Sequence, residues 1–496
     1  MGAGEVRLVY SSISLYVSLL WRMATSILYT IVVARRLNIG DYALLGLSVS
    51  FSMLFSLPVN QWAYWAQRAI ARRAGSGVGS TGLLLTLLYS LASLPLYIAV
   101  AWVESVVLGY GFRGLLLAVP LVVAMQVHVY LGSITSVTMP SRFAGARIAG
   151  DTVKLLAALT LVTYLGYKYP GAIAALTLST VTSMSIMLLL TYRRGMLRGG
   201  FEWPLAKSWI RGFYTPLARN MIGILRSLMR PIVSWVTGNP ASVAYLHVGL
   251  SAETPLLQAG SYTATPLYSR ALRKPSGDDV GTSLGLYLIF AGFIAAVLTG
   301  MAKPVVTTFN PAYIGAWPVM VLVTVYAFLF GVIGIYRSAL IALDTSDRKG
   351  LATGYRTFMT RILEANIAAM LVAYTAAVPL MWVYRGDALA PVAILLSSFI
   401  AVYTVLLAYY HRLLSKRLDY RPPHSEVAGL VLALAASYSY YYYSGAYSIV
   451  VTSFLRDVWG LILHIAVSGV IFYTIMLAVS PLARRILRRG FLMLSG

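Results

Sequence analysis

Long apolar segments recur along the whole sequence, and most charged residues fall in the short stretches between them. Apolar residues make up 59% of the 496 residues and charged residues 11%, whereas an ordinary soluble domain has about 25% charged residues. A soluble chain of this length could not build a polar surface from this composition, and so apolar a chain would not stay disordered. Because a helix needs about 20 apolar residues to cross a bilayer, the pattern predicts an all-α polytopic membrane protein.

The segments predict about fourteen transmembrane helices. The first segment is longer than the apolar region of a signal peptide and carries Arg22 in its middle, so we interpret it as a retained span. The predicted spans are residues 10–34, 41–63, 82–104, 114–138, 152–167, 171–192, 213–236, 241–268, 281–302, 316–341, 361–383, 388–410, 425–446 and 457–480.

The basic residues between the spans are distributed unequally. Alternate loops, together with both ends of the chain, contain 27 lysines and arginines, and the opposite set contains 7. Because basic residues accumulate on the cytoplasmic side, this bias predicts that both termini are cytoplasmic. The larger set includes Arg142, Arg147 and Lys154, which we place in the loop before the fifth span. The net charge is +24, but its scatter between apolar segments argues against a nucleic-acid partner.

A short motif occurs twice in the chain. Residues 42–48 and 245–251 both read Y-x-x-x-G-L-S, near the beginning of the second and of the eighth span. The repeat predicts two six-helix lobes that enter the membrane from the same side, with a substrate site at their interface. We therefore predict an N-terminal lobe, a cytoplasmic linker, a second lobe, and two further spans with a basic tail, at residues 1–195, 196–212, 213–415 and 416–496.

Five arginines lie inside predicted spans, where a cation costs at least about 2.5 kcal/mol on insertion scales. They are Arg22, Arg219, Arg226, Arg230 and Arg337. On a continuous helix, Arg219, Arg226 and Arg230 would form one stripe. Arg22 and Arg226 occupy similar positions before the two copies of the motif. Arg219 and Arg337 lie near the cytoplasmic ends of their spans and could reach the headgroups by snorkelling, whereas the other three are deeper.

One acid, Glu253, lies clearly inside a span, and one carboxylate cannot neutralise three deep guanidinium groups. A guanidinium group is permanently charged and its planar fork matches the oxygens of a phosphate. The deep arginines therefore predict a water-filled cavity that accepts a phosphate or carboxylate group. Glu253 would orient an arginine or bind a coupling cation, and the structural role is favoured.

Other reactive groups are sparse. The chain has no cysteine, and its five histidines show no metal-ligand spacing, so we expect no catalytic residue, no metal site and no bound cofactor. His128 and His247 lie within spans and are candidate cavity residues that could carry protons, although packing roles are favoured. The identity of a coupling ion, H⁺ or Na⁺, stays open.

Two stretches resemble the polysaccharide-transporter branch (Wzx-like, O-antigen flippases) of the multidrug/oligosaccharidyl-lipid/polysaccharide (MOP) exporter superfamily. Residues 34–43, ARRLNIGDYA, are similar to the family pattern A-R-x-L-G-x-x-x-Y-G, with Ala43 in place of its last glycine. Residues 141–149, SRFAGARIA, resemble the basic loop after the fourth span. Arg230 departs from the family, which often carries an acid near that position.

The resemblance implies a V-shaped pair of six-helix lobes that works by alternating access in the cell membrane. The implied substrate is a short glycan on a polyprenyl phosphate or diphosphate, flipped from the cytoplasmic to the outer leaflet. Arg22, Arg226, Arg230 and Arg219 would hold its anionic headgroup, and Arg337 would line the cavity. Membrane lipids and polysaccharide-assembly enzymes would be further partners.

Two other functions stay open at this point. A cation-coupled multidrug exporter of the same superfamily should carry acids in its spans, whereas the deep charges here are cationic. A membrane-embedded glycosyltransferase would use paired acids and a metal in an outer loop. The outer loops offer only isolated acids, which we place at Asp41, Glu104, Asp387 and Asp457.

Overall fold

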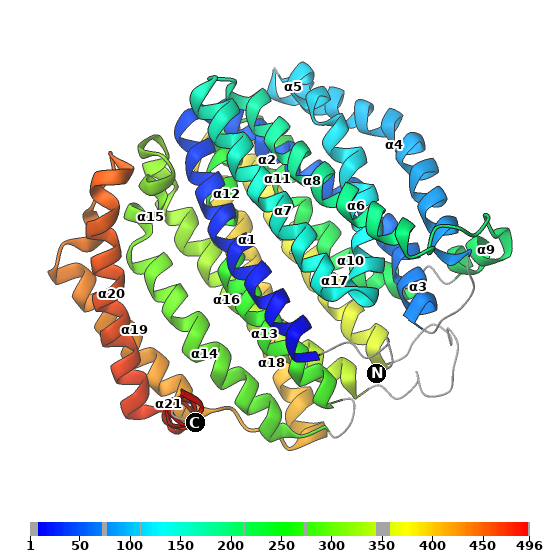
Figure 1. The fold of residues 1–496 in the computed structure, drawn as a ribbon. Coiled ribbons are helices and arrows are strands. Elements are labelled where there is room, and N and C mark those ends of the chain that lie inside the picture. Colours follow the sequence, from blue (N-terminus) through cyan, green and yellow to red (C-terminus); the bar gives the residue numbers. More distant parts are fainter. Residues whose placement is uncertain are drawn as a thin grey trace. The chain divides into compact units, whose positions relative to one another are not determined.

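The computed structural model describes residues 8–71, 77–109, 111–211, 214–271, 275–343 and 358–494. Within these ranges the chain is built from helices and contains no β-strand, which confirms the all-α prediction (Figure 1). Contacts between helices group the chain into two compact units, Met1–Ala244 (unit 1) and Tyr245–Gly496 (unit 2). Several predicted loop cations lie outside the described residues: Arg7, Arg72, Arg73, Arg273, Lys274, Arg348, Lys349 and Arg356.

The described residues of unit 1 form eleven α-helices, one π-helical segment (η1) and the start of a twelfth helix. Their bounds are α1 (Leu8–Arg36), α2 (Ile39–Ser56), α3 (Val59–Ala71), α4 (Val78–Leu108), α5 (Phe112–Leu117), α6 (Val119–Thr138), α7 (Pro140–Ala158), η1 (Leu159–Tyr164), α8 (Lys168–Arg193), α9 (Trp203–Arg211), α10 (Tyr214–Ser227), α11 (Met229–Thr237) and α12 (Pro240–Ala252).

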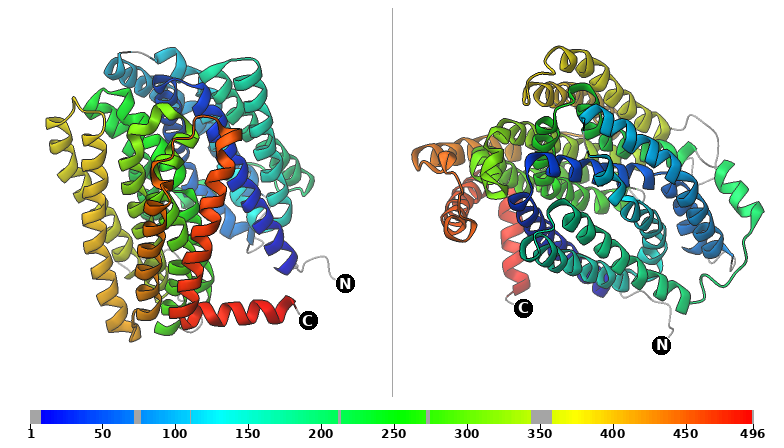
Figure 2. Two further views of the ribbon diagram at one scale, coloured as in Figure 1. Left: turned by 90° about the vertical axis from the view of Figure 1, so that its left-hand side faces the viewer. Right: turned by 90° about the horizontal axis from the view of Figure 1, so that it is seen from above.

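Unit 2 continues from within α12 and ends with a helix that runs crosswise to the one before it (Figure 2). Its elements are α13 (Thr254–Ala271), α14 (Gly277–Gly300), α15 (Ala302–Phe309), η2 (Pro311–Ala316), α16 (Trp317–Ala342), α17 (Phe358–Val383), α18 (Ala390–Leu418), α19 (His424–Tyr443), η4 (Ala446–Ser448), α20 (Phe454–Val479) and α21 (Pro481–Leu494).

Nine helical segments of the described chain are long and apolar enough to cross a membrane, so the protein is a multi-pass membrane protein. They are Ile39–Ser56, Val78–Leu108, Phe112–Thr138, Lys168–Arg193, Gly277–Gly300, Pro311–Ala342, Phe358–Val383, Ala390–Leu418 and Arg456–Val479. The other predicted spans overlap α1, the α7–η1 segment, the α10–α11 pair, the α12–α13 pair and α19. These helices are not among the nine, and the count of fourteen stays a prediction.

The first family-like stretch, residues 34–43, forms the turn between α1 and α2. The side chain of Asn38 accepts a hydrogen bond from the N–H of Asp41 (2.7 Å) and so caps the beginning of α2. Ala34 and Tyr42 on either side of the turn are buried. The motif therefore has a local structural reason, since it ends one helix and begins the next.

The second family-like stretch is not a loop. The sequence predicts a fifth span from residue 152, but α7 begins at Pro140, a residue favoured in the first turn of a helix. Arg142, Arg147 and Lys154 therefore lie in a helix and not in a loop, and their cytoplasmic side stays a prediction. The prediction of a loop was wrong because it took each charged residue to mark a segment that faces water.

The predicted linker at residues 196–212 also contains a helix, α9, which packs against α3 and α4. Ala206 and Trp209 are its buried residues. The backbone N–H of Glu202, just before α9, donates to the Thr81 hydroxyl (2.9 Å). These contacts hold the segment on unit 1.

The unit boundary differs from the predicted lobe boundary. It falls within α12, and α10 and α11 pack against α2, α3 and α4 of unit 1, although the prediction places them at the beginning of the second lobe. The units are defined by contacts between helices, whereas the lobes are predicted from a repeat in the sequence. The unit boundary therefore does not test the two six-helix lobes, which remain a prediction.

Each unit contains a tyrosine seated on a glycine of the neighbouring helix. In unit 1 the ring of Tyr130 (α6) fills the place of a side chain at Gly82 (α4), and its hydroxyl donates to the carbonyl of Gly79 (2.9 Å). In unit 2 the ring of Tyr287 (α14) does the same at Gly331 (α16), and its hydroxyl donates to the carbonyl of Phe328 (3.1 Å). In both cases the accepting carbonyl precedes the glycine by one helical turn. Small residues of this kind allow close helix packing in membranes.

Candidate functional site

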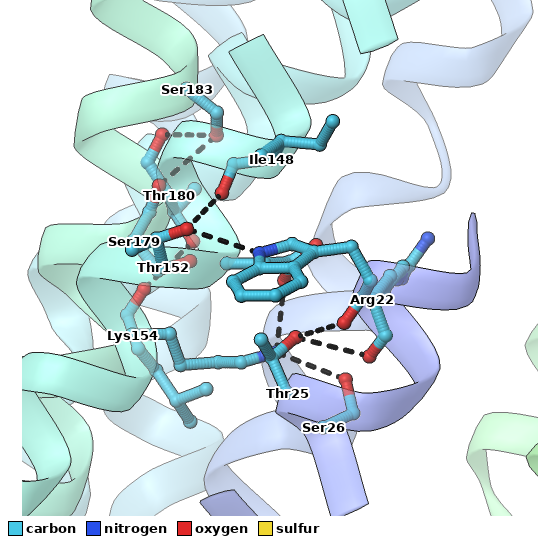
Figure 3. Close-up of polar contacts among 12 residues, drawn as sticks. Arg22, Thr25, Ser26, Ile148, Thr152, Lys154, Ser179, Thr180 and Ser183 are labelled. Carbon is cyan, nitrogen blue, oxygen red and sulfur yellow. Dashed lines mark hydrogen bonds and ion pairs between the residues drawn. The ribbon is translucent and has the colours of Figure 1, made fainter. Parts of the chain in front are cut away.

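The middle of α1 faces α7 through polar side chains (Figure 3). Arg22 lies midway along α1, about 21 Å from either helix end at 1.5 Å per residue. Its side chain is exposed, and no hydrogen bond or ion pair of its guanidinium is found among the described residues. The preceding residue, Trp21, donates from its indole nitrogen to the hydroxyl of Thr152 on α7 (3.0 Å). The structure thus places the predicted residue Arg22 beside a second polar helix.

That second helix carries an ion pair between a buried lysine and a partly buried aspartate. The ammonium group of Lys154 contacts Asp151 Oδ1 (2.9 Å) and donates to the hydroxyl of Ser26 on α1 (3.0 Å). It also lies over the ring of Tyr29, 5.8 Å from the ring centroid. Lys154 is 7% exposed. Its three contacts satisfy the ammonium, and its charge offsets that of Asp151.

Arg22 and the charged side chains around it have a net positive charge. Arg22 interacts electrostatically with Lys154 and with His128 of α6. Because Lys154 neutralises Asp151, the positive charge of Arg22 is left over among these four residues. We call Trp21, Arg22, Ser26, His128, Asp151, Thr152, Lys154 and Ser183 the unit 1 polar cluster.

His128 extends this cluster to α8. Its Nδ1 forms a hydrogen bond with the hydroxyl of Ser183 (3.1 Å). The Ser183 hydroxyl also lies within hydrogen-bond distance of the carbonyls of Ser179 and Thr180. His128, a candidate cavity residue in the sequence, is therefore part of a network that joins α1, α6, α7 and α8.

The predicted arginine stripe does not lie on one helix. α10 ends at Ser227 and α11 begins at Met229, because Pro231 has no N–H to continue the hydrogen-bond ladder. Arg226, in the last turn of α10, is half-buried. Arg230 donates from Nη1 to the hydroxyl of Ser50 on α2 (2.8 Å). The backbone of Arg219 is in α10, and its side chain lies outside the described residues.

The predicted residues of unit 2 lie in α12, at the break after it, and in α16. His247 and Glu253 are buried, and Glu253 occupies the break between α12 and α13. Arg337 of α16 is half-buried, with its guanidinium 5.9 Å from the centroid of the Phe330 ring. None of these residues belongs to the unit 1 polar cluster.

Glu104 is a further buried acid. It was expected in an outer loop, but it lies inside α4, fully buried, beside Ser234 and Trp235 of α11. Asp41 likewise lies in the first turn of α2 and not in a loop. Within the described part of the chain no group of three or more His, Cys, Asp and Glu residues could hold a metal ion.

Sequence reasoning missed Asp151, Lys154 and the hydroxyl groups around them. A signal was present, since an acid and a base three residues apart are neighbours on one face of a helix. Reading them as a pair would have extended the fifth span toward Pro140 and placed Lys154 near its middle.

Helices long and apolar enough to cross a membrane define the protein as a multi-pass membrane protein. Its solved structural neighbours belong to the MOP superfamily. No family model matches the sequence, and no relative was found among curated proteins.

Three of these neighbours illustrate the likeness. The lipid II flippase MurJ in an inward closed conformation has a TM-score of 0.65 at 12% identity, over 94% of this chain and 99% of that chain. An inward-facing multidrug resistance transporter of the MATE family has a TM-score of 0.61 at 13% identity, over 80% and 95%. A MOP superfamily transporter from Pyrococcus furiosus, described as having a binding pocket of reverse polarity, has a TM-score of 0.54 at 16% identity, over 82% and 95%. At these identities the likeness concerns the fold.

Proposed function

We propose that this protein is a transporter that flips a polyprenyl phosphate- or diphosphate-linked glycan from the cytoplasmic to the outer leaflet by alternating access. The observation that carries the proposal is the exposed Arg22 at the middle of α1, next to an acid that Lys154 already neutralises. A cation at this depth is costly unless it meets water or an anionic ligand. The anionic group of the lipid carrier is such a ligand.

The chemistry of the guanidinium group fits a phosphate. Its planar fork donates two parallel hydrogen bonds to phosphate oxygens, and it stays charged at every relevant pH. With both termini in the cytoplasm, the negative-inside potential would favour outward movement of an anion by about 2.3 kcal/mol per charge per 100 mV. The arginine and the potential would therefore act in the same direction.

The other predicted residues would have different roles in the proposed transport. Arg226 would contribute a second contact to the headgroup, with Arg219 nearer the cytoplasmic end. Arg230 has a structural role as well, because it binds Ser50. Glu253 would orient an arginine or bind a coupling H⁺ or Na⁺, and Arg337, His128 and His247 would line the cavity. Assembly enzymes that make the glycan remain candidate partners.

The runner-up is a cation-coupled multidrug exporter, since a MATE transporter shares the fold. A pocket for cationic drugs needs a carboxylate that is available to the drug. Asp151 is bound to Lys154 at 2.9 Å, which weighs against that function. A glycosyltransferase has less support still, because Glu104 is buried inside α4 and not placed in an outer loop.

The test is translocation in proteoliposomes with a fluorescent polyprenyl diphosphate glycan. Arg22→Ala should slow translocation at least roughly tenfold, and Arg22→Lys should retain part of the rate because the charge remains without the fork. Arg113→Ala, which removes an exposed arginine from α5, is the matched control and should leave the rate unchanged. Equal rates for native protein and Arg22→Ala would refute the role of Arg22. Export of ethidium-like cations without glycolipid transfer would establish the runner-up.

A further inference from the structure

The last two helices meet in a one-residue corner. α20 ends at Val479 and α21 begins at Pro481, so Ser480 alone separates them. The Ser480 hydroxyl accepts a hydrogen bond from the N–H of Ala483 (3.0 Å), which caps α21, and Pro481 occupies its first position. α20 is apolar enough to span a membrane, and a spanning α20 would place the beginning of α21 at the edge of the hydrocarbon.

A buried carboxylate holds this corner in place. Glu426, in the first turn of α19, accepts hydrogen bonds from the Ser480 hydroxyl (2.8 Å) and from the N–H of Leu482 (3.4 Å). Its other oxygen accepts from the Ser425 hydroxyl (2.8 Å). Glu426 and Leu482 both pack against Gly285 of α14, where a Cβ would lie 2.7 Å from Leu482 and 3.2 Å from Glu426. The direction in which α21 leaves α20 is thus built into unit 2, and it is crosswise (Figure 2, left).

The first two turns of α21, residues 482–488, divide into two faces. At about 100° per residue, Leu482, Ala483, Ile486 and Leu487 share an arc of about 140°, and Arg484, Arg485 and Arg488 share an opposite arc of about 100°. The three arginines are exposed, and α21 contains no acid. Leu482 and Ala483 are buried against unit 2, whereas Leu487 is 47% exposed. The apolar face therefore continues beyond the part that the protein covers.

We propose that α21 lies in the plane of the membrane surface and binds anionic phospholipid headgroups through Arg484, Arg485 and Arg488. Leu487 enters the boundary of the acyl chains, while the arginines extend their side chains to the phosphates. The charge and the position after a spanning helix select a lipid surface as the occupant. The proposed cytoplasmic location of the C-terminus makes this the inner leaflet, whose anionic lipids attract basic segments. The inference requires the spanning fold and does not depend on the transported substrate.

The natural absence of cysteine makes a direct test simple. The full chain with Leu487→Cys carries a single environment-sensitive fluorophore and is placed in nanodiscs of phosphatidylcholine, with or without phosphatidylglycerol. With phosphatidylglycerol we expect blue-shifted emission, quenching by lipids that carry a doxyl group in the acyl chain, and at least about twofold weaker quenching by aqueous acrylamide. High salt should reduce the dependence on phosphatidylglycerol.

Two matched variants complete the test. Arg484→Gln/Arg485→Gln/Arg488→Gln should abolish the response to phosphatidylglycerol. Arg412→Gln/Lys416→Gln/Arg421→Gln removes the same charge from exposed positions at and beyond the end of α18 and should preserve it. The proposal is overturned if the first variant keeps the response. It is also overturned if acrylamide is excluded without any quenching by the doxyl lipids, because the probe would then contact protein. Glycolipid translocation is a separate measurement, so each proposal can fail alone.

Discussion

Asp151 and Glu426 are both carboxylates in the helices of a membrane protein, and the structure stabilises them in different ways. Asp151, near the middle of the α7–η1 segment, pairs with the ammonium group of Lys154. Glu426, in the first turn of α19, is bound by two serine hydroxyls and one backbone N–H, all of them neutral groups.

The difference follows from position along a helix. In the middle of a helix every backbone N–H already donates within the helix, so only another side chain can compensate a charge. At a helix N-terminus the first N–H groups have no partner within the helix, and the helix dipole favours a negative charge. Glu426 lies near the beginnings of both α19 and α21, so it needs no cation.

The largest effect is expected from breaking the Asp151–Lys154 pair. Lys154→Met leaves a partly buried carboxylate without its cation and should lower the free energy of unfolding by up to about 3 kcal/mol. Denaturant unfolding of the purified protein in detergent measures this change. Asp151→Asn/Lys154→Met removes both charges and should regain most of the loss. A double variant as unstable as the single one would mean that the charge pair is not the cause.

A smaller loss is expected at the corner. Glu426→Ala leaves two hydroxyls and one N–H without their acceptor and should cost about 1–3 kcal/mol. Glu426→Gln keeps an acceptor oxygen and should cost much less, since no cation depends on the charge. The same unfolding measurement applies. If Glu426→Gln were as costly as Glu426→Ala, the negative charge itself would be required and the contrast with Asp151 would disappear.

The two serines that contact these groups allow a finer comparison. Ser480→Ala removes both a donor to Glu426 and the cap of α21, and should cost about 0.5–2 kcal/mol. Ser26→Ala removes one of the three contacts of Lys154 and should cost no more than about 1 kcal/mol. Unfolding of both variants under one condition gives the order. The reverse order would show that hydroxyl groups matter more to the mid-helix pair than to the corner.

The smallest effect is expected at an exposed carboxylate of the same helix-terminal kind. Asp387 Oδ1 accepts hydrogen bonds from the N–H groups of Leu389 (2.6 Å) and Ala390 (2.8 Å), which lower the pKa of Asp387 below its usual value. Since the folded-state pKa is the lower one, the stabilisation is complete above the unfolded-state pKa, near 3.9, and is lost as the pH falls through the folded-state value. Unfolding curves from pH 6 down to about pH 3 should show a slightly steeper fall for native protein than for Asp387→Asn. Parallel curves would contradict this.

Much of the fold could be predicted, because a helix that crosses lipid must be apolar along its length. The predicted spans coincide with described helices or with pairs of consecutive helices. The breaks at Leu228 and Glu253 were not predicted. Pro231 explains the first break, and Pro255, which also has no N–H, explains the second.

The candidate site could be predicted less well. Arg22 stands out because it is the one charged residue of an apolar segment. It can therefore be identified from the sequence without knowing which residues it contacts. Lys154 has a neutralising acid one turn away, so its charge looked like the edge of a loop. The contacts of Trp21 and Ser26 with α7 join residues more than 100 positions apart, and hydropathy carries no information about such pairs.

The tyrosine–glycine contacts limit how the helices can rearrange. In each pair the tyrosine ring occupies the space beside a glycine, and its hydroxyl donates to the carbonyl one turn before that glycine. These contacts resist sliding of α6 along α4 and of α14 along α16. Under the proposed alternating access, changes of shape should therefore leave these pairs in register and fall on the interruptions at Leu228 and Glu253. These interruptions would act as joints between stiff blocks.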